Sequence, residues 1–292
     1  MGLLRSIRPP EAVGLLTQLG FAPGDGASLA QAMVGAPGLV LVVGPASSGK
    51  TTTLHTLARS LNPSARIIAL GPGAAPRADG QNWEILSLRH VRTDSSRRRA
   101  FARVLPAGPH VLLLDEIRSP AIARLALAAV ARGTLVLGAV LAERAHQAFD
   151  ALERLGTQRN ELAAALSTIV GQCLIPALCL SCAQADTSSL VRGVLAPATN
   201  TWLEGKSVRA RGPRPGGCEH CLGQGYRGRL LAYEVLRGDA TVRAMLEEGV
   251  RGRALEQALL APGTSLWDRG IGLLAAGKTS LEALRQFVRE PD

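Results

Sequence analysis

A glycine-rich turn at residues 44–51 (GPASSGKT) separates an apolar run from a helical pattern. The run LVLVV before it has the character of a buried strand, and residues 50–61 continue as a helix. Glycines let successive backbone N–H groups face phosphate oxygens at the positive end of that helix. The alternative is a glycine-rich turn without function that happens to end in a basic residue. That alternative does not explain why the strand, the helix and the spacing occur together. The sequence therefore predicts a P-loop for ATP and Mg²⁺.

Within this loop, Lys50 is expected to reach the outer phosphates, and Thr51 to offer its hydroxyl to Mg²⁺. Lys50 is therefore both a binding and a catalytic candidate. The predicted nucleotide-binding residues are Gly44, Pro45, Ala46, Ser47, Ser48, Gly49, Lys50, Thr51 and Thr52.

The second motif is acidic and follows another apolar run, in VLLLDEIRS at residues 111–119. A buried strand there would deliver Asp115 and Glu116 to the sheet edge that carries the P-loop. One carboxylate would hold the water shell of the metal and the other would polarise the attacking water. Acidic residues after a strand often only begin the next turn, but the nearby P-loop favours function. We expect Asp115 to bind the cofactor and Glu116 to be catalytic.

Four of the five cysteines form two CxxC pairs, Cys179 with Cys182 and Cys218 with Cys221. Such pairs in a chain without a signal peptide are metal ligands more often than disulfides. Four thiolates close a tetrahedral shell, so the pattern predicts structural zinc, with His220 as a bystander. The fifth cysteine, Cys173, is expected to pack as a small buried hydrophobe.

Composition narrows the class of protein. The 292 residues include 47% hydrophobic residues, enough for a substantial core, and no apolar run long enough to cross a bilayer. The N-terminus lacks a signal-peptide pattern, so a cytoplasmic protein is expected. The formal charge of +10 suits nucleic acid, an anionic membrane or an acidic partner, but 3% aromatic residues leave few stacking platforms. Nucleic acid binding is therefore disfavoured.

Apolar runs that alternate with helical patterns predict an α/β fold, a parallel sheet with helices on both faces. The expected strands include RIIAL and residues 110–114 and 134–141, with a helix at 120–131. The domain division predicted from these patterns is a lead-in at 1–34, a P-loop core at 35–171, a zinc module at 172–232 and helices at 233–292.

Two other features, a run of arginines and a histidine, allow only less specific interpretations. The arginines at 97–99 suit the solvated face of a helix, with an arginine that reaches a neighbouring subunit's γ-phosphate as the alternative. His146 precedes an amphipathic helix and is interpreted as a surface residue rather than a catalyst.

In order, these motifs resemble the secretion ATPases of type II secretion and type IV pilus assembly. The likeness runs through GLVLVVGPASSGKTTTLH, LLLDEIRS, GTLVLGAVLAERAHQAFDALERLG and LSTIVGQCLIPALCLSCA. It continues in CEHCLGQGYRGRLLAYEVL, which resembles the family's second CxxC followed by GYRGR and the Tyr-Glu strand, and in AAGKTSLEALRQFV. The tetracysteine module resembles the assembly branch, since pilus-retraction ATPases lack it.

The resemblance implies a RecA-like P-loop NTPase core, an inserted tetracysteine zinc module and a helical C-terminal part. It also implies a hexameric or mixed ring that drives pilin or pseudopilin assembly with an inner-membrane platform or cytoplasmic adaptor protein. A peripheral inner-membrane position, on anionic lipid, would follow. Family members carry a preceding domain that presses arginines onto the nucleotide, and we expect it to be missing from this sequence.

The chain departs from the family pattern at three places. No carboxylate stands at residues 70–73, where the family has an acidic box, and Thr134 and Leu141 replace two histidines. Asp115 replaces a glycine, which leaves Glu116 as the matched glutamate. Two hypotheses follow: a motor ATPase, or a hydrolysis-impaired paralogue that binds nucleotide as a regulatory or structural subunit. A zinc-containing nucleic-acid-binding protein is a third, but it leaves GYRGR and the helical tail unexplained.

Overall fold

The computed structural model of the chain describes residues 9–33, 37–71, 82–87, 101–205 and 207–290. The chain divides into two compact units. Residues 1–171 and 235–259 belong to the first unit, and residues 172–234 and 260–292 to the second. The arginines at 97–99 lie outside the described residues. The four-part domain division drawn from the sequence stays a prediction.

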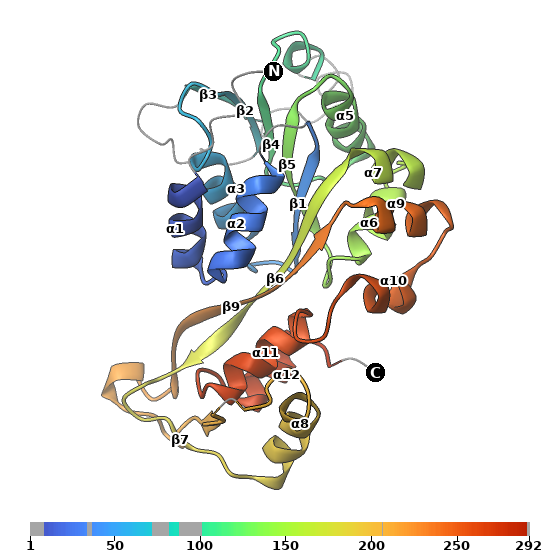
Figure 1. Cartoon of the computed structure of the whole chain (residues 1–292). Coiled ribbons are helices and arrows are strands. Elements are labelled where there is room, and N and C mark those ends of the chain that lie inside the picture. Colours follow the sequence, from blue (N-terminus) through green and yellow to red (C-terminus); the bar gives the residue numbers. More distant parts are fainter. Residues whose placement is uncertain (1–8, 34–36, 72–81, 88–100, 206, 291–292) are drawn as a thin grey trace. The chain divides into compact units, whose positions relative to one another are not determined.

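The first unit is built on a sheet of strand order β3-β2-β4-β5-β1-β6-β9 (Figure 1). Each of the pairs β3/β2, β2/β4, β4/β5, β5/β1 and β1/β6 is parallel. The strands are β1 (Leu39–Gly44), β2 (Arg66–Gly71), β3 (Asn82–Ser87), β4 (Val111–Leu114), β5 (Leu135–Leu141), β6 (Leu166–Leu178) and β9 (Tyr226–Arg237).

Burial explains why the central strands are continuous apolar runs. Every residue of β1 and of β4 is buried, as expected for parallel strands covered on both faces. Figure 1 shows α1, α2 and α3 to one side of the sheet and α5 and α7 to the other. The predicted parallel α/β sheet with helices on both faces is confirmed.

Helix α3 (Lys50–Arg59) begins at the P-loop and packs against β1 and β5. Helix α5 (Pro120–Ala131) has the predicted bounds, because Ser119 caps it by accepting a hydrogen bond from the N–H of Ile122, at 3.4 Å. Proline at its first position needs no N–H partner there.

Residues 9–33 form two helices despite their prolines, α1 (Pro9–Leu19) and α2 (Pro23–Ala32). They pack on each other, and α1 packs on α3. Leu16, Phe21 and Leu29 are almost wholly buried between them. Proline suits the first turn of each helix, which is why these residues do not interrupt the pattern.

Two C-terminal helices belong to the first unit, α9 (Ala240–Glu247) and α10 (Gly252–Leu259), both near predicted positions. Helix α9 packs against α7 (Arg159–Ala165), and Arg251, between α9 and α10, forms ion pairs with Asp150 and Glu153 of α6 (Gln147–Glu153). Arg159 bonds Asp150 at 2.7 Å and Glu153 at 2.9 Å, and also donates to the carbonyl of Val250 at 2.9 Å. This arginine therefore ties residues 235–259 to the sheet domain.

Among the described residues, the second unit contains the distal parts of β6 and β9, a short antiparallel pair of β7 (Gln184–Ala185) and β8 (Arg211–Gly212), and three α-helices. The helices are α8 (Ser189–Thr199), α11 (Leu266–Ala275) and α12 (Leu281–Phe287). Glu234 is buried and accepts from the N–H of Leu266 at 2.9 Å, at the start of α11.

Cys173 lies in the core of this second unit. Its thiol donates to the carbonyl of Phe287 at 3.1 Å, and burial raises its pKa to about 11. A thiol with so high a pKa stays protonated and unreactive, so its predicted role as a buried hydrophobe is confirmed.

Candidate nucleotide site and cysteine cluster

The loop between β1 and α3 has the backbone geometry of an anion-binding turn. Ser47 and Gly49 adopt left-handed conformations, with φ of 60° and 86°. Lys50 begins the helix directly after Gly49, and the N–H of Thr53 bonds the carbonyl of Gly49 at 3.0 Å. The free N–H groups of the first helical turn therefore stand beside the loop, as phosphate binding requires.

Lys50 lies inside this loop. Its ammonium group donates to the carbonyl oxygens of Gly44, at 2.9 Å, and of Pro45, at 2.6 Å. Burial lowers the pKa of Lys50, while the carboxylate of Glu116 acts in the opposite direction and favours the charged form. The two residues that the sequence proposes for catalysis are therefore close enough to interact electrostatically.

The sheet topology explains this proximity. β5 alone separates β1 from β4, and the three strands are parallel, so their carboxyl ends share one edge. Glu116 follows β4 with its side chain 38% exposed, within 3.6 Å of the Arg118 guanidinium. The glutamate therefore combines access to solvent with closeness to Lys50, which a residue that activates water needs.

Asp115 has different surroundings. Its Oδ1 lies 3.6 Å from Nε2 of His55, a residue of α3. Among the residues that the structure describes, neither of these two buried atoms has a hydrogen-bond partner. A Cβ placed on Gly71 would lie 1.7 Å from Oδ2 of Asp115. The Asp115 carboxylate thus fills the space that a side chain at position 71 would need.

Two departures from the family pattern are consequently linked. The glycine at the end of β2 and the aspartate after β4 are neighbours across the β2/β4 strand pair. A carboxylate stands at this edge of the sheet, but β4 supplies it instead of β2. His55, whose ring also meets Trp83 edge to face at 6.1 Å, was not singled out from the sequence. Its only sequence signal is its place five residues after Lys50 on the same helix.

The segment after β5 also reaches this edge. Leu141 ends β5 at this edge and is 55% exposed. Thr134 directly precedes β5 and therefore lies at the other, amino end of the strand, where it is buried and donates to the carbonyl of Pro109 at 3.1 Å. Neither offers the imidazole that the family has there. Beyond Leu141, the guanidinium of Arg144 forms an ion pair with Glu256 of α10.

The interpretation of His146 as a surface residue is wrong. Its side chain is 8% exposed, because Glu256 of α10 lies over it with a carboxylate oxygen 3.9 Å from Nδ1. Burial lowers the pKa of His146, although the Glu256 carboxylate opposes that effect. His146 and Glu256 are far apart in the sequence, and the periodicity of a single segment cannot reveal a contact between two distant segments.

The Arg144–Glu256 pair gives a testable stability effect. The side chains are only 9% and 18% exposed, so Glu256→Gln removes the carboxylate that faces a buried guanidinium. We expect the free energy of unfolding to fall by about 3 kcal/mol in urea titrations. Glu290→Gln is the matched control, because its pair with Arg285 is exposed and should contribute less than about 0.5 kcal/mol. Equal effects of the two substitutions would contradict the assignment.

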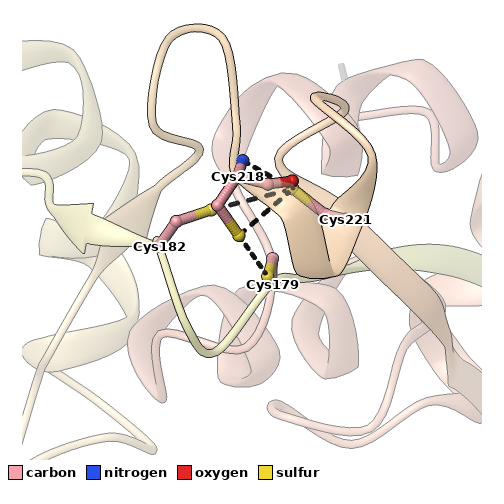
Figure 2. A group of neighbouring side chains, drawn as sticks. All are labelled: Cys179, Cys182, Cys218 and Cys221. Carbon is pink, nitrogen blue, oxygen red and sulfur yellow. Dashed lines mark hydrogen bonds between the residues drawn. The ribbon is translucent and has the colours of Figure 1, made fainter.

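The four CxxC cysteines converge in the second unit (Figure 2). Their sulfur atoms all lie within 4.8 Å of one another, with Cys179 and Cys218 at 3.7 Å and Cys182 and Cys221 at 3.8 Å. No other group of three or more histidine, cysteine or acidic side chains within the described part of the chain is this close. His220 is exposed and outside the cluster, which confirms it as a bystander.

The cluster fits a tetrahedral metal ion. Zinc–sulfur bonds of about 2.3 Å place the four sulfurs of a tetrahedron about 3.8 Å apart. Cys221 also accepts N–H groups of Cys218 and Gly225, both at 3.2 Å. Desolvation raises its pKa, but these N–H groups and the neighbouring thiols outweigh that and bring it to about 6. A sulfur so readily ionised is suited to act as a metal ligand.

Comparison with known proteins decides the family. The model described as Type II/IV secretion system protein matches residues 3–286. The chain belongs to this family. It is 30% identical over 261 residues to the type II secretion system protein E of Dickeya dadantii, covering 87% of this chain and 49% of the relative. It is 27% identical over 288 residues to the Thermus thermophilus type IV pilus assembly ATPase PilB, covering 96% and 31%.

Solved structures agree on the fold. The pilus retraction motor PilT with bound ADP gives a TM-score of 0.64 at 19% identity, covering 94% of this chain and 66% of that one. The Legionella pneumophila ATPase DotB gives 0.63 at 13% identity, covering 93% and 64%. The predicted RecA-like α/β fold is confirmed. The chain spans about half the length of the type II secretion relatives, 49% to 53%.

Proposed function

We propose that residues 44–52 bind Mg-ATP and that the chain serves as a secretion ATPase in pilin or pseudopilin assembly. The shared edge of the sheet supports this proposal most directly, because the parallel strands β1 and β4 bring a P-loop cation and a solvent-accessible carboxylate to the same side. Lys50 would move from its loop carbonyls to the outer phosphates, and Thr51 would supply a hydroxyl to Mg²⁺. Glu116 would polarise the attacking water.

Asp115 would serve the metal at the same edge of the sheet. Its carboxylate stands beside Gly71 and faces His55, so it is held near the carboxyl ends of β2 and β4. Mg²⁺ usually keeps several waters and is bound through one or two carboxylates. Asp115 therefore fits a role in holding the water shell of Mg²⁺. The thiolates of Cys179, Cys182, Cys218 and Cys221 would hold structural zinc.

The proposed partners follow from the family. Its members include proteins of type II secretion and type IV pilus systems. We propose that this chain works in a hexameric or mixed ring, with an inner-membrane platform or cytoplasmic adaptor protein. A peripheral place on the cytoplasmic side of the inner membrane suits the formal charge of +10. Among the described residues, no helix is long and apolar enough to cross a membrane.

A second candidate function is a regulatory or structural subunit that binds nucleotide and hydrolyses it poorly. Leu141 favours it, because leucine at the carboxyl end of β5 cannot donate the hydrogen bond of a histidine to a γ-phosphate. The loss of one preorganised donor costs a factor of about a hundred or more in rate. If a partner subunit supplies the missing groups, ATP turnover returns when that subunit is added. Turnover measured with and without the partner therefore separates the motor from the regulatory subunit.

Nucleotide affinity and Mg-ATP turnover of the wild type and of Lys50→Ala test the proposal. We expect the variant to lose turnover and to bind ATP about a hundredfold more weakly, because a charged donor to the phosphates is gone. Lys278→Ala removes an exposed lysine of the second unit and is the matched control. Both measurements should cover protein concentrations on either side of ring assembly.

The outcomes separate the candidates. Turnover that disappears in Lys50→Ala supports the motor function. Micromolar ATP binding without turnover supports the regulatory subunit. Wild-type protein that binds no nucleotide at any concentration contradicts both.

A further inference from the structure

His55 and Asp115 face each other through two buried polar atoms. Nε2 of His55 lies 3.6 Å from Oδ1 of Asp115, and the two side chains are only 9% and 15% exposed. Within the described ranges of the chain, neither atom has a hydrogen-bond partner. A movement of about 0.5 Å would bring the two atoms within the usual length of an N–H···O hydrogen bond.

Packing alone does not account for a histidine at position 55. The residue lies in α3, and its ring meets Trp83 edge to face, with centroids 6.1 Å apart. A phenylalanine would keep that contact and bury no polar nitrogen. A buried donor that faces a buried acceptor without bonding it costs free energy, so the arrangement calls for an explanation. Hydrogen bonds in functional sites commonly tighten when the ligand binds, which offers one.

The two oxygens of the Asp115 carboxylate have different surroundings. Oδ1 faces His55 and is buried. Oδ2 lies over Gly71, where a Cβ would stand only 1.7 Å from it. The side chain keeps 15% of its surface exposed although Oδ1 is buried, so its contact with solvent is made by the other atoms. The glycine therefore leaves room for Oδ2 to accept from water while Oδ1 faces the histidine.

Both residues are held by elements that lead to the phosphate-binding edge of the sheet. His55 is five positions after Lys50 on α3, about one and a half helical turns from the P-loop. The N–H of Asp115 donates to the carbonyl of Leu70 at 3.0 Å, which continues the pairing of β4 with β2. The histidine and the carboxylate thus meet beside the proposed nucleotide site.

We propose that His55 is a positioning residue for Asp115. When Mg-ATP is bound, Nε2–H of His55 donates to Oδ1, and the carboxylate is fixed with Oδ2 toward the water shell of Mg²⁺. Carboxylates at metal sites are themselves held by outer hydrogen bonds, and loss of such a partner weakens metal affinity by about 10- to 100-fold. The inference rests on the nucleotide site proposed above and gives a role in it to a residue that touches neither nucleotide nor metal.

The Mg²⁺ dependence of nucleotide binding tests the proposal without any turnover. A fluorescent ATP analogue is titrated into the full chain at a series of Mg²⁺ concentrations and in buffer without Mg²⁺. His55→Phe keeps a ring beside Trp83 but removes the donor, so the Mg²⁺ concentration needed for half-maximal binding should rise about tenfold. Affinity without Mg²⁺ should not change, because every P-loop contact with the phosphates remains.

Two further variants separate positioning from stability. His55→Gln retains an N–H donor, so its Mg²⁺ dependence should stay within about threefold of the wild type. His110→Phe is the matched control, because His110 stands at the amino end of β4, opposite Asp115, and its Nδ1 accepts the N–H of Arg66 at 3.0 Å. The same substitution there should lower the melting temperature and leave the Mg²⁺ dependence unchanged.

A double substitution tests whether the histidine acts through Asp115. Asp115→Asn should itself raise the Mg²⁺ requirement, and His55→Phe should add no further change in that background. Additive effects of the two substitutions would overturn the proposal.

Failure of this inference is distinguishable from failure of the nucleotide site. A wild type that binds the analogue with Mg²⁺, beside a His55→Phe variant with the same Mg²⁺ dependence, refutes only the role of His55. A wild type that binds no analogue at any Mg²⁺ concentration refutes the nucleotide site and this role with it.

Discussion

Cys221→Ser is expected to release zinc and to unfold the turns that carry the four cysteines. Its sulfur lies 3.8 Å from the sulfurs of both Cys182 and Cys218 and accepts two backbone N–H groups, so it holds both turns together. Structural zinc contributes about 10 kcal/mol or more to the folding of small zinc domains. Loss of one thiolate ligand should remove most of that contribution. Metal analysis and limited proteolysis of residues 179–225 would measure both effects.

Cys173→Ser is the matched control, because it makes the same atomic change outside the cluster. The serine hydroxyl can still donate to the carbonyl of Phe287, so zinc content and protease resistance should remain. Chelation of the wild type should reproduce the Cys221→Ser pattern without any substitution. Full zinc content in purified Cys221→Ser would contradict the four-thiolate assignment.

The core of the first unit was predictable because its signals are local. A buried parallel strand is a short apolar run, so β1, β4 and β5 are visible directly in the sequence. The P-loop adds glycines at positions that require left-handed backbone, as at Gly49. The cysteine cluster was predictable for the same reason, since each CxxC pair is complete within four residues.

Contacts between distant segments were not predictable. Nothing in the sequence near Gly71 shows that the Asp115 carboxylate fills the space beside it, because that depends on the β2/β4 pairing. The burial of His146 likewise depends on Glu256, which comes from a helix more than a hundred residues later. β3 was also missed, because NWEILS mixes apolar residues with one charged and two polar residues. The predicted helical part at 233–292 includes α11, but the sequence analysis did not give its bounds. Helix α11 owes its position to the buried acceptor Glu234.

Glu116→Gln should lower Mg-ATP turnover by a factor of about a hundred to a thousand with little loss of nucleotide affinity. The amide keeps the size of the side chain but cannot take a proton from the attacking water. A second effect follows from the neighbouring lysine. The Glu116 carboxylate raises the pKa of Lys50 against the effect of burial, so its removal should lower that pKa further.

The direction of this shift in the pKa of Lys50 can be tested independently, by the pH dependence of ATP binding. ATP binding needs charged Lys50 and therefore weakens as pH rises through the pKa of the lysine. In Glu116→Gln, this weakening should begin at a lower pH than in the wild type. Glu204→Gln removes an exposed acid of the second unit and should change neither turnover nor the pH profile.

Turnover and pH profile together distinguish a catalyst from a structural residue. A Glu116 that only stabilises the fold would lower the melting temperature in Glu116→Gln and leave turnover by the folded protein unchanged. Unchanged turnover in Glu116→Gln would remove this residue from the mechanism. Asp115 would then be the remaining carboxylate at the carboxyl end of β4, and its contact with His55 would give the next pair to vary.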